Sequence, residues 1–360
     1  MVANNSFFKM LKSKKTVFNS SDISGLLTDV DKERVNKVAE GVSRYLKDNL
    51  PKAFDKRKKL ADYRINPYVL MTSASILDLD DPDRFANFIF NSKFYMALET
   101  SFGKSIEATF VGQYPIGQTP RWEDPKEKLA ESEGLNGLTH EAKTQKRTES
   151  VWREIDKSIE VGEHRYLVTI KSGPNTINDS QVQAMTDAIR NKYKTWAHWS
   201  KNNNKSIKYV DIVIGLTYGT DKVTNNKDNQ ILTKLLDCGF IEEDRNRCPG
   251  VLIDEETRTV RVYRKVGIDY WAFIGNPVDP SSAQHVFLEI LLGLAKALSK
   301  GVDRKFIEEG VNLRIRKLSN ALSTLQFPRG CLPEWIKDEF NEDELFMFTT
   351  AMSAFYDEGI

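Results

Sequence analysis

The stretch that most constrains how this chain can fold is the run Tyr166–Ile170. It is followed by Lys171 and then interrupted at Gly173-Pro174. Aromatic and β-branched residues favour strands, and a Gly-Pro pair ends them. The run therefore predicts a short buried strand with an ammonium group at its tip. A lysine left unpaired at the end of a buried strand is costly in free energy, so the position of Lys171 favours a functional site over an ordinary surface charge.

A carboxylate lies on the predicted partner of this strand. Residues 151–161 and 166–171 are predicted to form a hairpin that turns at residues 162–164, and Asp156 precedes Lys171 by fifteen residues. An acid and a lysine at the ends of two paired strands can form a cross-strand salt bridge, or they can hold a metal ion and a phosphate. Spacing alone leaves both interpretations open.

The second interpretation has a definite chemistry. Hydrolysis of a phosphodiester needs a metal-held hydroxide, neutralisation of the phosphoryl oxygens and help for the leaving group. Mg²⁺ prefers oxygen ligands. In this scheme Asp156 bridges the metal and the scissile phosphate, the carbonyl of Ile170 is a second ligand, and Lys171 lies against the phosphate and the attacking water.

Composition narrows the class of protein only broadly. The chain has 360 residues and a net charge of +1, which leaves nucleic acid open as a partner because binding depends on local patches. Three cysteines, Cys238, Cys248 and Cys331, form no paired framework, so we expect a reduced protein without disulfides or structural zinc. No apolar run is long enough to span a membrane, and we expect a soluble cytoplasmic protein.

The order of hairpin, helix and strand predicts an α/β fold, with a mixed sheet flanked by helices and helical additions at both ends. We expect one compact unit made of an N-terminal helical region at 1–90, a catalytic core at 91–300 and a C-terminal helical region at 301–360. The predicted core elements are a helix at 178–193, strands at 209–216, 251–253 and 260–263, a buried helix at 286–298, and a long surface loop at 112–148.

Helical periodicity is strong near both ends of the chain. An N-terminal helix with Val35 and Val38 on its apolar face is expected to stop at Pro51, and another helix is predicted at 85–111. The segment 303–326 has a coiled-coil-like seam that can be intramolecular core or a dimer interface.

Four pieces of this sequence, in order, resemble segments of a group of type II restriction endonucleases in the PD-(D/E)XK superfamily. They are Glu99–Glu107, Ile170–Asn178, Gly215–Gly219 and Gly267–Gly275. The resemblance implies a restriction-endonuclease-like core and a Mg²⁺-dependent homodimer that cuts double-stranded DNA at a short, palindromic sequence. It also implies a cognate DNA methyltransferase in the same system, although not as a physical partner.

The sequence departs from the family motif at Thr169, where the motif has Asp or Glu. A hydroxyl is a poor ligand for a hard metal ion, so an active site needs a second carboxylate from elsewhere. We favour Glu107, on the preceding helix, as a metal ligand, because the resemblance includes that helix. Asp187 and Glu160 are weaker candidates. A solvated helix carboxylate is the competing interpretation of Glu107 and Asp187.

A basic segment follows the predicted site. From Arg190 to Lys208 the chain has six basic residues, no acidic one, and interleaved aromatic residues. Such lysines can neutralise DNA phosphates, and asparagines can read base edges, although a solvated helix end is equally consistent. The predicted DNA contacts are Ser172, Asn175, Asn178, Lys192, Lys194, Lys201 and Asn203. The first three can instead form the turn and cap the next helix.

Two other functions remain open at this point. One is another nuclease of the same fold, which acts in repair or recombination and recognises DNA structure. The other is a DNA-binding protein without catalysis, in which Thr169 records the loss of the second acid.

Overall fold

The computed structural model describes the backbone of only part of the chain. The described residues are 30–55, 69, 72–73, 76–77, 82–109, 122–125, 139, 141–142, 145, 150–171, 177, 179–219, 227–237, 241–243, 250–252, 259–300, 309–313, 315–317 and 319–320. The chain divides into two compact units, one made of 1–42 with 103–297 and the other of 43–102 with 298–360. The first unit contains the sheet.

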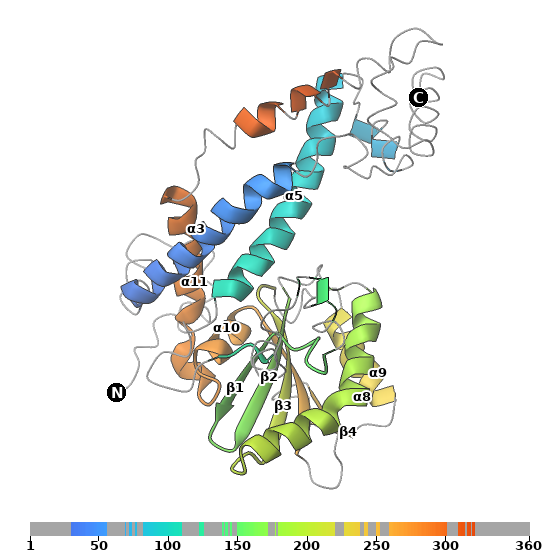
Figure 1. The fold of residues 1–360 in the computed structure, drawn as a ribbon, viewed down its shortest axis with the longest axis vertical. Coiled ribbons are helices and arrows are strands. Elements are labelled where there is room, and N and C mark those ends of the chain that lie inside the picture. The colour runs from blue at the N-terminus through green and yellow to red at the C-terminus, as the bar shows by residue number, and fades with distance from the viewer. Residues whose placement is uncertain are drawn as a thin grey trace, which may run out of the picture. The chain divides into compact units, whose positions relative to one another are not determined.

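A six-stranded mixed sheet forms the centre of this unit, in the order β1-β2-β3-β6-β5-β4 (Figure 1). The strands are β1 (Lys157–Val161), β2 (His164–Lys171), β3 (Tyr209–Leu216), β4 (Ile241–Glu243), β5 (Gly250–Leu252) and β6 (Val260–Val266). β2, β3 and β6 are parallel to one another, whereas β1, β4 and β5 pair antiparallel to their neighbours. The predicted mixed α/β core is therefore confirmed.

The hairpin forms with different limits from those predicted. Residues 151–154 are turns rather than strand, β1 begins only at Lys157, and His164 belongs to β2 rather than to the turn. Gly162 has a φ of 59°, a left-handed conformation that glycine adopts without steric cost. The turn is therefore shorter than expected because a single left-handed glycine is enough to reverse the chain.

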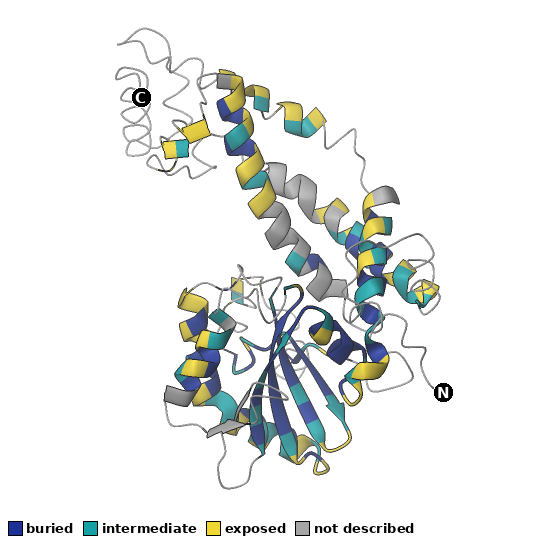
Figure 2. Ribbon diagram, turned by 180° about the vertical axis from the view of Figure 1, so that it is seen from behind, coloured by how far each residue is buried: buried dark blue, intermediate teal, exposed yellow. Residues whose placement is uncertain are grey.

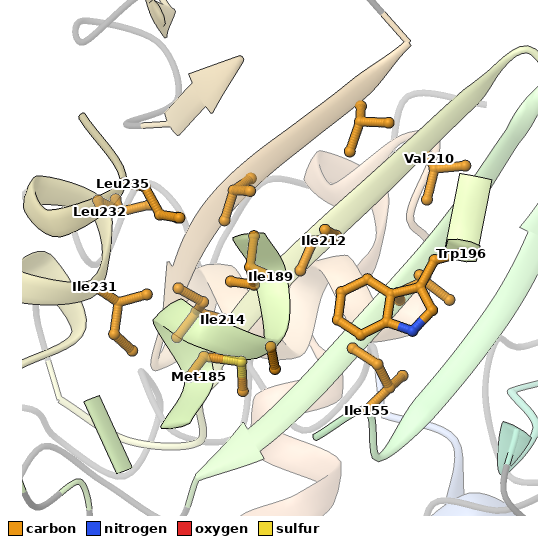
Figure 3. Packing of buried hydrophobic residues seen from close by; sticks show 14 of the residues in the cluster. Ile155, Met185, Ile189, Trp196, Val210, Ile212, Ile214, Ile231, Leu232 and Leu235 are labelled. Atoms are coloured by element: carbon orange, nitrogen blue, oxygen red, sulfur yellow. The ribbon is translucent and has the colours of Figure 1, made fainter. Parts of the chain in front are cut away.

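One face of the sheet is covered by α8 (Asp179–Asn203) and α9 (Lys227–Asp237). Helix α8 makes the crossover that two parallel strands require, and it is longer than the predicted 178–193. Val182, Met185 and Ile189 point into the core, as predicted from their helical spacing. Figure 3 shows Met185 and Ile189 packed with Ile212 and Ile214 of β3 and with apolar residues of α9.

The other face of the sheet packs against α10 (Ile268–Gly275), which is buried along most of its length. Tyr166 of β2 meets Phe273 of this helix, with ring centroids 5.3 Å apart. The central strands are buried over most of their length (Figure 2). A core on both faces of β2 and β3 fixes the strand ends that carry the candidate site.

Part of the predicted surface loop 112–148 is instead built into the core. Trp122 is buried and donates a hydrogen bond from Nε1 to the carbonyl of Ile274, at 2.9 Å. Glu123 exchanges two backbone hydrogen bonds, each 2.8 Å long, with Ser158 of β1. The prediction was wrong for residues 122–125, because a few residues that pair with the open edge of β1 satisfy its backbone groups.

Helices α3 (Lys32–Asp55) and α11 (Val286–Lys300) pack against each other through a buried charge and a close contact. Glu289 is fully buried and accepts hydrogen bonds from Arg34 Nε and Nη2 at 2.8 and 2.6 Å. A Cβ added to Gly293 would lie 2.5 Å from Val38 Cγ1, so the glycine permits the close approach. The removal of Arg34 would leave the buried Glu289 carboxylate without its guanidinium partner.

Two helical predictions need correction. Helix α3 continues past Pro51 to Asp55, because a proline removes one hydrogen bond but leaves the following residues able to form theirs. Helix α11 is not buried all round, since Leu291 is 46% exposed. Helix α5 (Pro82–Thr109) agrees with the predicted 85–111, and of the 303–326 seam only parts are described.

The remaining short helix, η3 (Pro280–Ala283), links α10 to α11. None of the helices that the structure describes combines the length and the apolar character needed to cross a bilayer.

The contact between β3 and α10 gives a prediction about stability. A Cβ at Gly215 would lie 2.2 Å from Cε2 of Tyr270 and 2.9 Å from the carbonyl oxygen of Thr169. Because the Tyr270 ring is buried and the carbonyl is backbone, neither can move away cheaply. Gly215→Ala is expected to lower the free energy of unfolding by about 1–3 kcal/mol, measured by urea denaturation followed by tryptophan fluorescence.

Gly310 is the matched control for this substitution. It lies in a helical segment, and a Cβ there would have no heavy atom within 4 Å. Gly310→Ala is expected to leave stability unchanged or to raise it by about 0.5–1 kcal/mol. Equal stability of Gly215→Ala and the wild type would contradict the packing described for Gly215.

Candidate active site

The start of β1 carries an irregularity that sets the position of Asp156. In the β1–β2 register Lys157 is opposite Val168, yet Asp156 N also donates to the Val168 carbonyl, at 2.8 Å. Two residues of one strand therefore oppose one residue of the other, which is a β-bulge. Bulges redirect a side chain relative to the regular strand, and here the redirected group is the carboxylate.

The Asp156 carboxylate is held against the end of β2. Its Oδ2 accepts a hydrogen bond from Ile170 N at 2.7 Å and one from Thr169 Oγ1 at 3.4 Å. A carboxylate has about four lone-pair sites, so these two bonds do not saturate it. They do fix its orientation at the strand end.

Lys171 lies on the same face of the sheet as this contact. Side chains alternate between faces along a strand, so those of Thr169 and Lys171 project to the same side of β2. Because the Thr169 hydroxyl reaches Asp156 Oδ2, the carboxylate lies toward that side as well. The Asp156 carboxylate therefore lies beside the end of β2 that carries Lys171, on the side to which the Thr169 side chain projects.

The carbonyl of Ile170 projects toward the same edge. In a β-strand the N–H and C=O of one residue point to the same side. Since Ile170 N faces Asp156, the Ile170 carbonyl also faces the β1 side of β2, just beyond the last residue pair of the hairpin. The predicted pair of oxygen donors, a carboxylate and a backbone carbonyl, is therefore directed to one place.

Thr169 has a different role from the acid that the family motif would place there. It is fully buried, and its hydroxyl donates to the Asp156 carboxylate. A hydroxyl used in this way orients an acid and does not replace one. The need for a second carboxylate therefore remains.

The three candidates for that carboxylate differ in their surroundings. Glu107 lies in α5, but its side chain is outside the described residues. Both oxygens of Asp187 accept hydrogen bonds from Gln183 Nε2, at 3.0 and 2.9 Å. Glu160 is next to the β1–β2 turn, where it accepts a hydrogen bond from Arg165 at 2.6 Å. Glu160 is thus at the end of the hairpin far from Lys171.

The predicted DNA contacts fall into two groups. Ser172, Asn175 and Asn178 follow Lys171 directly, but lie outside the described residues. Lys192, Lys194, Lys201 and Asn203 lie on α8, which runs back along the sheet. These four residues differ from the first group because α8 leads away from Lys171.

The end of α8 lies beside the β1–β2 turn. Asn204 Nδ2 donates to Glu160 Oε2 at 3.0 Å, and Lys208 N donates to the Glu163 carbonyl at 2.8 Å. An eight-residue strand such as β2 spans about 25 Å, so Lys201 and Asn203 lie near the opposite end of the sheet from Lys171. The Asn203 side chain also donates to the Trp199 carbonyl, at 2.9 Å.

The aromatic residues between these lysines contribute to the core. Trp196 is fully buried, and its Nε1 donates to the Val151 carbonyl at 3.0 Å. The guanidinium of Arg165 lies 4.2 Å from the centre of the Trp199 ring. Burial lowers the pKa of Arg165 from its usual value, while the charge of Glu160 opposes that shift. The alternation of basic and aromatic residues in this segment is thus an amphipathic helix pattern.

A polar cluster that the sequence reasoning missed lies at the starts of the parallel strands. The buried Asp211 carboxylate meets His164 Nδ1 at 2.7 Å and Arg261 Nε at 2.8 Å. No local motif marks these residues, because they come from three strands that meet only through the parallel register.

This cluster also affects a neighbouring tyrosine. Burial, with a further contribution from the Asp211 charge, raises the pKa of Tyr166 to about 12. The neutral phenol is therefore favoured in the folded protein.

The donor set at the end of β2 suits a hard cation. Carboxylate and carbonyl oxygens are the ligands that Mg²⁺ prefers, and it usually keeps several waters. Among the residues whose side chains are described, no three His, Cys, Asp or Glu groups come together as a metal site. The Asp156 carboxylate and the Ile170 carbonyl are the two oxygen donors directed to this strand end.

A mixed sheet with an acid and a lysine on one face, at the end of two paired strands, is the arrangement of PD-(D/E)XK nucleases. Residues 133–244 match the family model of the type II restriction endonuclease EcoO109I. The matched range contains β1, β2, α8 and β3, and hence Asp156 and Lys171. The predicted resemblance to type II restriction endonucleases is thereby confirmed. No individual curated protein matches the chain.

The raised pKa of Tyr166 gives a pH prediction. A phenol with a pKa of about 12 in the fold, against 10.0 normally, favours folding while it is protonated. That contribution is complete below pH 10 and is lost as the pH rises through 12. Tyr166→Phe is expected to reduce this alkaline loss, measured as urea midpoints between pH 9 and 12. The difference between the ultraviolet titrations of wild type and variant should have its midpoint near 12, and a midpoint near 10 would contradict the assignment.

Proposed function

We propose that this protein is a type II restriction endonuclease that hydrolyses phosphodiester bonds in double-stranded DNA with Mg²⁺. The observation that carries the proposal is the contact of Asp156 Oδ2 with Thr169 Oγ1 and Ile170 N. It supports an acid and Lys171 on one face of the same strand end. The family match over 133–244 supports the same class.

Asp156 and the carbonyl of Ile170 would hold the metal ion. A bound Mg²⁺ supplies a hydroxide nucleophile and neutralises charge on the phosphate. The two hydrogen bonds to Oδ2 keep the carboxylate oriented, so the ligand is in place before the substrate arrives. Such preorganisation matters because a loosely held ligand weakens both metal affinity and rate.

Lys171 would contact the scissile phosphate and the attacking water. A lysine ammonium is a compact charge with three donors, and it stabilises negative charge that develops on the phosphoryl oxygens in the transition state. The carbonyl of Lys171 accepts a hydrogen bond from Thr217 N at 2.9 Å. This bond to the neighbouring strand end limits the movement of the lysine backbone.

For the second carboxylate we propose Glu107. Asp187 is less suitable because its oxygens bind Gln183, which in turn accepts a hydrogen bond from Lys234 at 2.8 Å. That network connects α8 to α9 and accounts for Asp187 without a metal. Glu160 is less suitable because it pairs with Arg165 and Asn204 at the far end of the hairpin.

We also propose a homodimer that cuts both strands of a short palindrome, since two-fold symmetric DNA calls for two sites related by a two-fold axis. Ser172, Asn175 and Asn178 are the proposed DNA contacts that follow Lys171 most closely in sequence. Lys192, Lys194, Lys201 and Asn203 remain proposed contacts, although the last two would require DNA that extends along α8. A methyltransferase of the same specificity is expected to protect host DNA.

Incubation of the purified protein with phage DNA and Mg²⁺ tests the proposal. Discrete fragments would support a restriction endonuclease. A smear, or nicks that depend on DNA structure, would identify another nuclease of this fold. Retarded but intact DNA would identify a binding protein without catalysis.

Substitution of the acid and the lysine tests the site itself. Asp156→Asn and Lys171→Ala are each expected to lower the cleavage rate by at least about 100-fold, because the first weakens the binding of the metal ion and the second removes a positive charge that stabilises the transition state. Specific DNA binding in Ca²⁺ should persist. Cleavage is measured as product per unit time on a plasmid, and binding by gel retardation.

Lys208→Ala is the control for Lys171→Ala. Lys208 is exposed and pairs with Glu163 near the β1–β2 turn, at the other end of β2 from Lys171. Its removal should leave cleavage unchanged. Wild-type rates in Asp156→Asn or Lys171→Ala would show that the site is elsewhere.

The second carboxylate is tested by the pair Glu107→Gln and Asp187→Asn. Glu107→Gln should reduce cleavage strongly and raise the Mg²⁺ concentration needed for half-maximal rate, because a ligand is lost. Asp187→Asn should cleave like the wild type. The opposite result would assign the second ligand to α8.

A further inference from the structure

An aromatic residue projects from the strand end next to Lys171. β2 and β3 are parallel, with Lys171 paired to Leu216, and Tyr218 follows two residues later. Adjacent strands are about 4.8 Å apart and rise about 3.3 Å per residue, so the Cα of Tyr218 lies within roughly 10 Å of that of Lys171. This is roughly three base steps of DNA, at about 3.4 Å per step.

Tyr218 differs from the residues before it in its exposure. Every residue of β3 from Val210 to Leu216 is buried, and Thr217 is only 5% exposed, whereas Tyr218 is 48% exposed. The chain therefore leaves the core and reaches the solvent at Tyr218. This change occurs beside the candidate active site.

The turn that carries Tyr218 is held on both sides. Thr217 N donates to the Lys171 carbonyl at 2.9 Å, and the Thr217 carbonyl accepts a hydrogen bond from Trp271 Nε1 at 2.7 Å. Trp271 is itself buried in α10. The backbone just before Tyr218 is thus fixed both to the catalytic strand and to the core.

Two glycines fix the backbone after Tyr218. Gly219 has a φ of 120° and Gly267 a φ of 57°. A Cβ on Gly267 would lie 2.4 Å from the Gly219 carbonyl oxygen, so the two chain segments are in close contact. Gly267 N also donates to the Leu216 carbonyl, at 2.9 Å. The aromatic ring is therefore presented by a short, well-packed turn.

We infer that Tyr218 is a DNA-contacting residue, whose ring packs against a base or deoxyribose close to the scissile phosphate. The inference rests on the proposed function. A tyrosine offers a large contact surface with only two side-chain torsions, so little conformational entropy is lost on binding. Every base has an aromatic face that can stack on such a ring.

This contact positions the duplex relative to Lys171 and the Asp156 carboxylate. A phosphate displaced by even about 1 Å from its productive position reacts far more slowly. A ring on a rigid turn, one strand away from the lysine, is suited to that positioning.

The test compares DNA affinity in three substitutions. The cut sequence is first read from the ends of phage DNA fragments produced by the wild type. A short labelled duplex with that sequence then gives Kd in Ca²⁺ by fluorescence anisotropy. Tyr218→Ala and Tyr218→Leu are expected to raise Kd roughly 10-fold, whereas Tyr218→Phe, which keeps the ring, should bind like the wild type.

The dependence of Kd on salt separates a ring contact from a phosphate contact. The loss of a phosphate contact lowers the slope of log Kd against log salt concentration, whereas the loss of stacking shifts the line without a change of slope. Tyr95→Ala is the control, since Tyr95 is a 67% exposed tyrosine in α5. It should leave Kd unchanged.

The outcomes are distinguishable. Wild-type affinity in Tyr218→Ala, weak binding by Tyr218→Phe, or a lowered salt slope would each overturn the inference, while cleavage by the wild type would leave the proposed function standing. A wild type that neither cuts nor binds DNA would reject the proposed function and this inference with it. Circular dichroism verifies that each variant is folded, and Tyr218→Phe gives a comparison that keeps the turn intact.

Discussion

β2 and β3 pair in parallel, and two parallel neighbours cannot be joined by a tight turn. The chain must cross over between them, and α8 makes that crossing. As a result both strands end at the same edge of the sheet, where Lys171 and Thr217 share a hydrogen bond. The candidate catalytic residues and Tyr218 are neighbours because of this pairing, and α8 necessarily leads away from them.

Within that frame the site depends on how one carboxylate is oriented. A β-bulge at the start of β1 directs Asp156 toward the end of β2, where a backbone N–H and the Thr169 hydroxyl hold it. Thr169 thus donates a hydrogen bond to Asp156 across the hairpin and is not itself a second carboxylate. If the proposed function holds, the second metal ligand comes from an element other than β2. The residue at the family's acid position, Thr169, instead orients Asp156.

The core strands and helices could be predicted because their signals are local. The limits of β3 and the inward side chains of α8 follow from runs of apolar residues and from helical spacing. The errors arose where distant contacts decide the outcome. Residues 122–125 lie in a polar stretch of sequence, but Glu123 pairs with the edge of β1 and Trp122 is buried. Trp196 is surrounded by basic residues in sequence but is buried against Val151. The cluster of Asp211 with His164 and Arg261 has no local signature at all.

By itself the sequence determined that an acid precedes a lysine by fifteen residues, that the lysine ends a buried strand, and that Thr169 stands where the family motif has the second acid. These are properties of order and spacing, which covalent connection fixes. Only the tertiary structure decided that the Asp156 carboxylate lies against the end of β2, and that Lys201 and Asn203 lie at the other end of the sheet. Both depend on strand register and on the direction of a crossover helix. Register and crossover direction are set by packing between residues far apart in the chain, so linear spacing does not encode them.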